Sequence, residues 1–486
     1  MAGWGAEAGD PAPLRPSGPS EHPGELLQYD SLGRLVATPT NAIPPPLLPP
    51  HSMGIQSQIP NPPRGLGHAD ATIRRRIDEV PRVGWEWFPA APPPLMPYLA
   101  GNDRLGNTSL RPGSLFEVTP WEGAIQGAKY AASTFGLNYS LAQTLSVVGM
   151  GSPLQGDRWL GAYGLDFFAK WTVFSSHGGA AAGWISTQIE AQEGLGSASR
   201  TETPQSNLGT FTNPSGAWSS RQGFRIPELA WQQSLDHGRF VALAGVVSQG
   251  NYLDANTYAN SARGQFLNSA LINSMVLPLP DYNLGASLQY QPQDSWFVQV
   301  GGSVGNTPAG AAPWVDFSRE TWSAVGELGF TTQNVAGLGP GAYRIQPFIA
   351  SAGGPTQGGL AFNLQQRLGE QVPVGWFGRF GVGGSAVTQA SAQIGTGFVV
   401  QAPLRHLGLI RSQPNDGFGV GVVWSRPSPQ GDGLTPSDET VLELGYVLQL
   451  TPMLRVQPDL QIVWNPAQNP DTDRALVVQL QLDASW

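Results

Sequence analysis

The sequence predicts an all-β protein: a transmembrane antiparallel β-barrel of about 16 strands, preceded by a proline-rich N-terminal extension and a short helix. The first observation is a period-two alternation of apolar and polar residues over segments of roughly ten residues, which is typical of strands. Charged residues make up only 13% of the chain, about half the share in a typical globular protein. No run of about 18 apolar residues exists, so no helix is expected to span a membrane, whereas barrel strands hide their apolar residues in alternation.

The alternation is clearest from Leu442 to Trp486. Apolar residues occupy even-numbered positions from 442 to 450, from 454 to 464 and from 476 to 486, and polar residues such as Glu443 and Gln481 stand between them. Two turns, one at Thr451-Pro452 and one at 465–474, separate the three runs. This pattern predicts three long strands, each with one apolar face toward lipid and one polar face toward a lumen.

Similar alternation indicates earlier strands, beginning with 135–141. The others are predicted at 163–173, 228–232, 284–290, 296–300, 322–330, 343–349, 376–382 and 418–424. Dividing residues 135–486 by about 20–22 residues per strand and turn gives roughly sixteen strands, a size that leaves an aqueous channel. Two connections, 191–222 and 250–280, are long enough to lie outside the barrel or to fold into its lumen.

The chain divides into two predicted parts. Residues 1–117 form a largely irregular, periplasmic extension, because proline clusters such as 44–46 and 92–94 favour extended conformations without ladder hydrogen bonds. Residues 118–486 form the barrel, and a short helix with Pro120 in its first turn precedes the first strand. The extension is either a flexible arm or a segment that docks on a periplasmic partner or on the inner mouth of the barrel.

Several functions are disfavoured. The chain contains no Cys, so it has no disulfide framework and no thiolate metal site, and its net charge of -9 argues against nucleic acid as a partner. No His-Glu-x-x-His pattern is present, and no Gly-x-Ser-x-Gly stretch suggests a nucleophile elbow, so we predict no catalytic residues, no metal and no cofactor. A barrel of the outer membrane requires an export signal, which is not visible at Met1–Gly5 and is expected to have been removed or to lie upstream.

The chain resembles the carbohydrate-selective porin family, known as OprB porins, over about residues 118–486. The resemblance rests on several short motifs: Pro120-Trp121-Glu122-Gly123 before Gly136-Leu137-Asn138-Tyr139, the segment 228–239, Phe266-Leu267-Asn268-Ser269-Ala270, and the C-terminal segments 439–446, 450–452 and 457–461. Three features depart from the family: Glu122 stands where Gly is preferred, the final residue is Trp486 instead of Phe, and the proline-rich extension has no counterpart. These departures bear on selectivity more than on the fold.

The resemblance implies a sixteen-stranded barrel of the outer membrane that passes carbohydrates by diffusion. Such a channel needs polar groups that replace water at sugar hydroxyls, and aromatic faces on which a sugar ring can lie. The inward phase of the predicted strands supplies these candidates: Asp166, Phe168, Lys170, Glu190, Glu228, Phe297, Arg344, Phe348, Arg379, Glu443, Arg455 and Asp459. Each could instead line a wet wall where the charged groups satisfy one another.

Two alternatives stay open. The barrel could be a general ion and solute porin, or a plugged structural barrel that anchors a periplasmic or surface assembly through its N-terminal arm. In every case the expected partners are permeating sugars or other small solutes, outer-membrane lipid and the barrel-assembly machinery during biogenesis.

Overall fold

The computed structural model describes residues 25–29, 35–39, 114–116, 121–133, 135–176, 181–216, 218, 223–280, 282–293, 295–305, 320–332, 334–369, 374–409, 416–429 and 436–485. The chain forms two compact units, 1–52 and 53–486. In the first, β1 (Glu25–Tyr29) and β2 (Leu35–Pro39) pair as an antiparallel hairpin with Glu25 opposite Pro39. Most of the predicted extension, including 40–113, and the final Trp486 lie outside the described residues.

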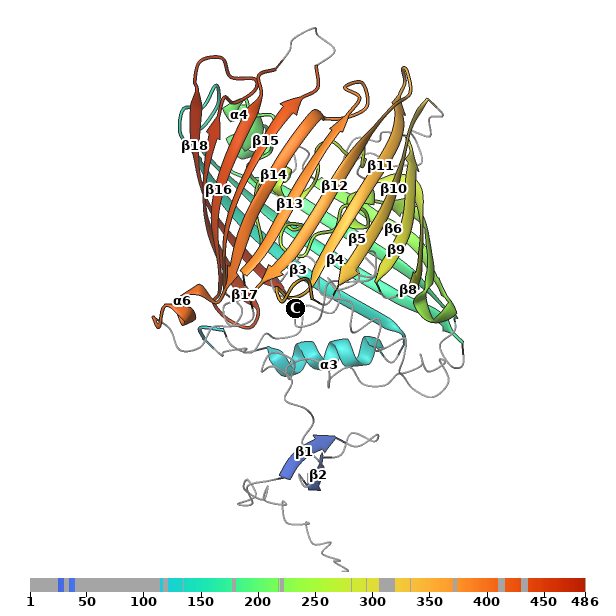
Figure 1. Ribbon diagram of the computed structural model, residues 1–486. Coiled ribbons are helices and arrows are strands. Elements are labelled where there is room, and N and C mark those ends of the chain that lie inside the picture. The colour runs from blue at the N-terminus through green and yellow to red at the C-terminus, as the bar shows by residue number, and fades with distance from the viewer. Residues whose placement is uncertain are drawn as a thin grey trace, which may run out of the picture. The chain divides into compact units, whose positions relative to one another are not determined.

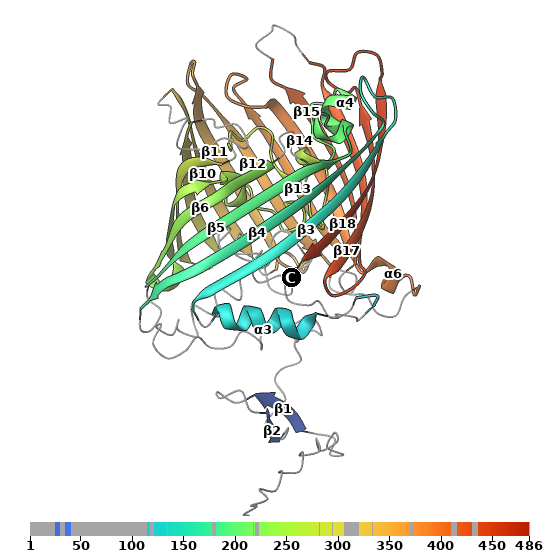
Figure 2. The same ribbon diagram turned by 180° about the vertical axis from the view of Figure 1, so that it is seen from behind.

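The second unit contains a closed antiparallel barrel (Figures 1 and 2), as the sequence predicts. Among the described residues its wall consists of 16 strands, in agreement with the predicted number. Each strand pairs with its neighbours in sequence, and the last strand pairs with the first, Leu480 standing opposite Val147. The strands are β3 (Leu137–Met150), β4 (Trp159–Ser175), β5 (Ala181–Leu195), β6 (Gly223–Leu235), β7 (Phe240–Val247), β8 (Asn283–Gln293), β9 (Trp296–Val304), β10 (Thr321–Thr332), β11 (Gly341–Ala352), β12 (Gln357–Leu368), β13 (Val374–Gly383), β14 (Ala390–Gln401), β15 (Gly417–Pro427), β16 (Glu439–Gln449), β17 (Leu454–Trp464) and β18 (Arg474–Ser485).

Closure satisfies every strand edge, and the alternation then decides which side chains face outward. Along β16 the odd-numbered residues are buried and the even-numbered residues are partly exposed, so Glu443 points inward and Leu444 outward. Outward residues of other strands are apolar and open, for example Leu480 with 46% of its surface exposed. A backbone with no free edge and an apolar outer surface is the arrangement that lets strands lie in lipid.

A helix of about three turns precedes β3, the first strand of the barrel. It is α3 (Glu122–Ser133), close to the predicted segment, and it lies across the end of the barrel where β3 begins (Figures 1 and 2). Gly136 then turns the chain into β3 with a φ of +78°, which L side chains rarely adopt. Its carbonyl accepts a hydrogen bond from the Thr172 N–H at 2.9 Å. No helix among the described residues is long and apolar enough to cross a membrane.

The connections differ between the two ends of the barrel. At the end near α3 most are short, such as the 3-10 turn η4 (Asp236–Gly238) between β6 and β7, although α6 (Pro403–His406) lies in a longer one. At the opposite end, which we call the loop end, two long segments join β5 to β6 (the β5–β6 loop, 196–222) and β7 to β8 (the β7–β8 loop, 248–282). The first starts later than predicted, since residues 191–195 extend β5 through pairing with β4 and β6.

Both long loops are packed inside the barrel, which is one of the two predicted placements. The β7–β8 loop carries η5 (Gln249–Asn251) and α5 (Ser269–Ile272), and most of its described residues are buried. The β5–β6 loop carries η3 (Ala198–Arg200) and α4 (Pro204–Leu208), with Trp218 fully buried. The lumen therefore has a core of its own, and the barrel is partly filled by its own chain.

Candidate functional site

The inner wall and the two infolded loops define the candidate site. Every residue predicted for the lumen lies on the inward face of its strand and is buried or nearly so. The structure distributes these residues over the whole circumference, from β4 to β17, and does not bring them together at one point. Their contacts separate them into residues that fix the loops and residues on a wall that solvent still reaches.

Glu443 is the clearest loop anchor. From β16 its carboxylate accepts the backbone N–H of Leu267 at 2.5 Å and that of Asn268 at 2.9 Å, both in the β7–β8 loop. Two N–H donors on one carboxylate make charge-assisted hydrogen bonds, which are stronger than neutral ones. The motif around Phe266 that supports the family resemblance is thus the part of the loop held by Glu443, and Asn268 caps α5 by accepting from the Ala270 N–H at 3.0 Å.

Arg379 holds the same loop at two other points. Its guanidinium lies 3.1 Å from the carboxylate of Asp254 and donates to the carbonyl oxygen of Leu271 at 2.7 Å. Asn363 of β12 donates to the same Asp254 carboxylate at 2.6 Å. The neighbouring pair Arg344–Glu327, with a separation of 3.5 Å, is also buried. These groups form one desolvated network. Removal of any one of its charged side chains would leave the charge of its partner buried and unpaired.

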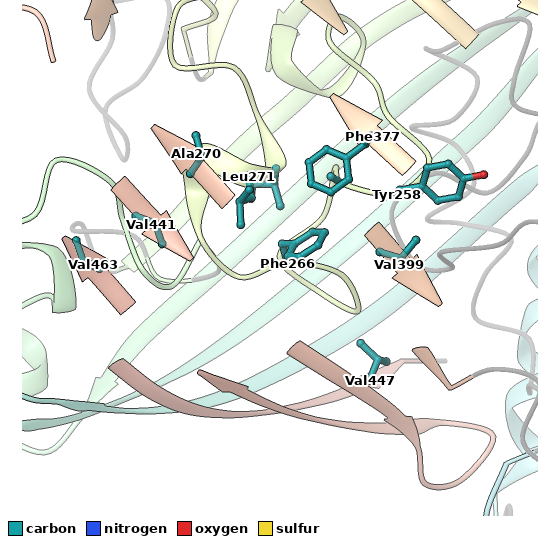
Figure 3. Close-up of a cluster of buried hydrophobic side chains, with 12 residues drawn as sticks. Tyr258, Phe266, Ala270, Leu271, Phe377, Val399, Val441, Val447 and Val463 are labelled. Carbon is teal, nitrogen blue, oxygen red and sulfur yellow. The ribbon is translucent and has the colours of Figure 1, made fainter. Parts of the chain in front are cut away.

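Apolar packing completes the seat of the β7–β8 loop. Phe266, Leu271 and Tyr258 of the loop pack against inward valines of β14 to β17 and against Phe377 of β13 (Figure 3). The rings of Phe266 and Phe377 lie 5.3 Å apart at 57°, a favourable tilted arrangement. The apolar patch on the inward face of the barrel wall therefore packs against the β7–β8 loop, which covers it.

The predicted aromatic residues are embedded in the wall. Phe297 is fully buried, and its ring fills the place where a Cβ on Gly329 would lie. Phe348 packs over Gly359 and Gly383 within a cluster that includes Leu253 and Val276 of the loop. Phe168 is also buried. All three are on the inward side as predicted, and their role in stacking on a sugar stays a prediction.

The β5–β6 loop is anchored by a residue that the sequence analysis did not select. Glu439 of β16 accepts four hydrogen bonds: from the N–H of Phe211 (2.7 Å), from the N–H and hydroxyl of Thr212 (2.9 and 2.7 Å) and from the N–H of Ala467 (3.0 Å). Glu439 has the same inward phase as Glu443, so the alternation of β16 carried the signal for it. Gln461 of β17 adds a bond to the carbonyl oxygen of Pro214 at 2.8 Å.

One residue of the β7–β8 loop reaches β3 and β4. Arg263, in the β7–β8 loop, donates to the Thr144 hydroxyl of β3 at 2.8 Å and forms an ion pair with Asp166 of β4. On the other side of this residue, the Gly264 N–H donates to Gln457 of β17 at 3.2 Å. The loop thus bridges β17 and the β3–β4 wall. Arg263 has no alternation pattern around it, which is why the sequence did not identify it.

The wall from β4 to β6 carries charges in close pairs of opposite sign or over aromatic rings. Glu190 of β5 pairs with Arg225 of β6 at 2.9 Å. Lys170 of β4 lies 4.1 Å from the ring centre of Trp184, a cation–π contact. Glu228 accepts a hydrogen bond from the Tyr252 hydroxyl of the β7–β8 loop. Arg225, Trp184 and Arg263 therefore join the predicted residues here.

Arg455 and Asp459, the remaining predicted residues, lie on β17. Arg455 donates to the side chain of Gln449 at 3.0 Å, and Asp459 accepts from Gln461 at 2.9 Å. These contacts are cross-strand and along-strand links on the inward face. They agree with the expectation that lumen groups satisfy one another.

Solvent exposure separates the two sides of the lumen. The exposed fractions of the side chains are 8% for Arg225, 16% for Glu190 and 18% for Arg263, but only 1% for Arg344 and 2% for Arg379. Water therefore reaches Glu190 and Arg263 beside the β4–β6 wall, whereas the ion pairs at β10 to β13 are sealed by the β7–β8 loop.

A closed sixteen-stranded barrel with a partly filled, charged lumen defines a porin-like channel protein. The family model for carbohydrate-selective porins of the OprB family matches residues 178–358 and 350–485. The chain belongs to this family.

The chain is similar to a solved structure and to curated proteins. The high-pH structure of OprB from Pseudomonas putida is similar with a TM-score of 0.59 at 18% identity, covering 76% of this chain and 99% of that chain. Among curated proteins, Porin AaxA of Chlamydia abortus is 26% identical over 49% of this chain and 53% of its own length. Porin AaxA of Chlamydia caviae is 27% identical over 48% and 52%. The chain thus matches these relatives over about half of their length.

Proposed function

We propose that the protein is an outer-membrane porin through which carbohydrates and other small solutes diffuse passively along the β4–β6 side of the lumen. The observation that carries this proposal is the difference in exposure between the two sets of ion pairs. Solvent contact at Glu190 and Arg263 supports a wet path beside the loops, and burial of Arg344 and Arg379 argues against a path between the β7–β8 loop and those two residues.

The charge pattern of this wall favours uncharged solutes. Glu190 with Arg225, and Asp166 with Arg263, cancel each other at short range, so the path offers no large field of one sign. Their remaining hydrogen-bonding capacity can replace water at sugar hydroxyls. Several weak contacts of this kind suit diffusion, because tight binding would slow exit from the channel. On this proposal Glu190 is the predicted residue that solutes pass, and Arg263 lies beside the same path.

The proposed membrane orientation follows from the connections. Short turns are typical of the periplasmic end of such barrels and long loops of the outer end. The end with α3 and both ends of the barrel's chain then faces the periplasm, and the loop end faces the exterior. The exposed apolar residues of the strands would contact lipid, and insertion would require the barrel-assembly machinery. An N-terminal arm at the periplasmic side could reach a periplasmic partner.

Planar-bilayer conductance of the purified protein, titrated with glucose and maltodextrins, tests the function. We expect an open channel whose current falls saturably as sugar is added. Glu190→Gln leaves Arg225 without its carboxylate, so we expect this variant to shift ion selectivity toward anions without loss of the folded barrel. Gln143→Ala, a change on the outer face of β3, is the control and should alter neither property.

The two alternatives are outcomes of the same experiment. A current that ignores sugar would identify a general ion and solute porin. A silent full-length protein whose conductance appears after deletion of residues 1–110 would identify the plugged structural barrel. The infolded loops are a specific observation in favour of a low conductance, because they occupy part of the lumen in either case.

A further inference from the structure

A cavity of about 480 Å³ opens at the loop end, away from the charged β4–β6 wall. Its floor is the start of β10 and the end of β11, where Ser323 stands opposite Ala350. Its sides are the β5–β6 loop at Gln205 and Phe211, the β7–β8 loop at 277–280, and the β13–β14 turn at 385–389. We call it the vestibule. Its volume is within the range of small-molecule sites, about 300–1,000 Å³.

The vestibule is uncharged. None of the described residues that line it is Asp, Glu, Lys, Arg or His. Its polar groups are hydroxyls and carboxamides, including those of Thr321, Ser323, Gln389 and Gln468. Within the described residues, the side chains of Ser323, Gln389 and Gln468 make no hydrogen bond to the protein, so these groups are available to a solute. The charged groups of the β4–β6 wall, by contrast, are already paired.

The vestibule is held in shape by the infolded loops. Phe211 has its N–H fixed by Glu439, and its carbonyl oxygen accepts from Gln205 at 2.7 Å. Its ring belongs to the same apolar cluster as Leu277 and Val387, which line the opposite sides. Two prolines, Pro278 and Pro280, restrict the backbone of the intervening segment. A site built on anchored segments keeps its polar groups in place before a solute arrives.

We propose that the vestibule is a docking site for neutral polyhydroxylated solutes, the chemical class of sugars. Hydroxyls and carboxamides both donate and accept hydrogen bonds, so they can replace water around a polyol. Without a countercharge the same groups give an ion no compensation for the water that it loses. The vestibule would thus collect neutral solutes at the loop end. This inference rests on the proposed function, since it gives a docking site for the class of solute that is proposed to pass.

The absence of Cys from the chain makes a direct test possible. In Gln389→Cys the new thiol lies at an exposed position of the vestibule, and in Ser323→Cys it lies on the floor. The rate of alkylation by a neutral maleimide is measured with the full-length protein in vesicles, with increasing maltose. Thr356→Cys is the matched control, because it is exposed at the same end but outside the lining.

We expect maltose to protect both vestibule thiols saturably and to leave Thr356→Cys unaffected. At ten times the dissociation constant the alkylation rate should fall about tenfold by mass action. Gluconate and glucosamine, which are charged, should protect far less than glucose, the neutral sugar of similar size. Equal protection by the charged solutes, or none by maltose at either thiol, would overturn the inference.

The result is distinguishable from failure of the proposed function. Saturable block of current by sugar, without protection of either thiol, would leave the porin intact and remove the vestibule as a docking site. Protection of both thiols in a protein that never conducts would keep the docking site and refute passive transport.

Discussion

The hydrogen bonds of Glu443 lead to a sharp prediction about how the lumen is filled. Glu443→Gln preserves the size of the side chain but leaves a single acceptor oxygen. The second oxygen becomes an NH₂ group, which faces the backbone N–H donors of the loop and cannot accept from them. One of the two bonds, to Leu267 or to Asn268, is then lost and the other becomes neutral. The strand ladder of β16 with β15 and β17 uses backbone groups only and is unchanged.

The magnitude follows from the bonds exchanged. Two hydrogen bonds to a charged group, at about 1.5–3 kcal/mol each, are replaced by one neutral bond of about 1 kcal/mol. The lower cost of burying an amide than a carboxylate offsets part of the difference. We therefore expect the β7–β8 loop to be held less tightly by about 2 kcal/mol, which increases its released population roughly thirtyfold. The barrel itself should remain folded.

Trypsin reports on the loop, because Arg263 is the only Lys or Arg between 248 and 282. In the wild-type protein its guanidinium is bound to Thr144 and Asp166. We expect Glu443→Gln to be cleaved after Arg263 much faster, while heat-modifiable migration on a gel shows an intact barrel. The adjacent Leu444→Arg is the matched comparison, since a cation on the lipid face near mid-strand costs about 2–4 kcal/mol and impairs assembly. Loss of the folded barrel in Glu443→Gln, or normal assembly of Leu444→Arg, would refute the assignment of faces.

Three further predictions concern other parts of the chain. Arg263→Gln leaves Asp166 buried without its cation, so the channel should become more cation-selective, as a reversal potential in a salt gradient measures; Arg263→Lys should restore most of the wild-type value. Hydrogen bonds from the Asn207 side chain and the Asp157 N–H lower the pKa of Glu202. The ionised Glu202 therefore stabilises the β5–β6 loop at a pH above 4.5, the ordinary pKa of a glutamate. This contribution is lost as the pH falls through the lower pKa of the folded state. Glu202→Gln should abolish this acid dependence, as amide hydrogen exchange in the β5–β6 loop measures it, and an unchanged profile would exclude Glu202 as its source. Gly136→Ala forces a φ of +78° on an L residue and should destabilise the barrel by about 1–2 kcal/mol in urea unfolding, with Gly136→Asn costing less.

The inward and outward faces of the barrel wall could be predicted from the sequence of each strand alone. Along β16 the alternation of Leu442, Leu444 and Tyr446 with Glu443 assigns each side chain to one face, because a strand has a period of two. The same rule placed Asp166, Arg344 and Asp459 on the inward side. Strand boundaries were less certain: residues 191–195 looked like a connection, and pairing with β4 and β6 makes them strand.

The partners inside the lumen could not be predicted in this way. Asp254 and Arg263 lie in a loop without periodicity, and their partners Arg379 and Asp166 are 125 and 97 residues away in sequence. The predicted list of lumen residues therefore mixed two kinds of group. Glu443 and Arg379 hold a loop, whereas Glu190 remains in contact with solvent. The two kinds can be told apart only when the position of the folded loop is known.

The sequence by itself determined that the chain is a β-barrel of about sixteen strands and which residues of the predicted strands face the lumen, because alternation along one strand is a local property. Tertiary structure decided how much of the lumen stays open. Whether an inward carboxylate meets water or a backbone N–H depends on where a distant loop folds, and a loop that packs through Phe266 and Leu271 carries no local period that announces its place. The uncharged vestibule arises in the same way, since its sides come from segments that only closure of the barrel brings together.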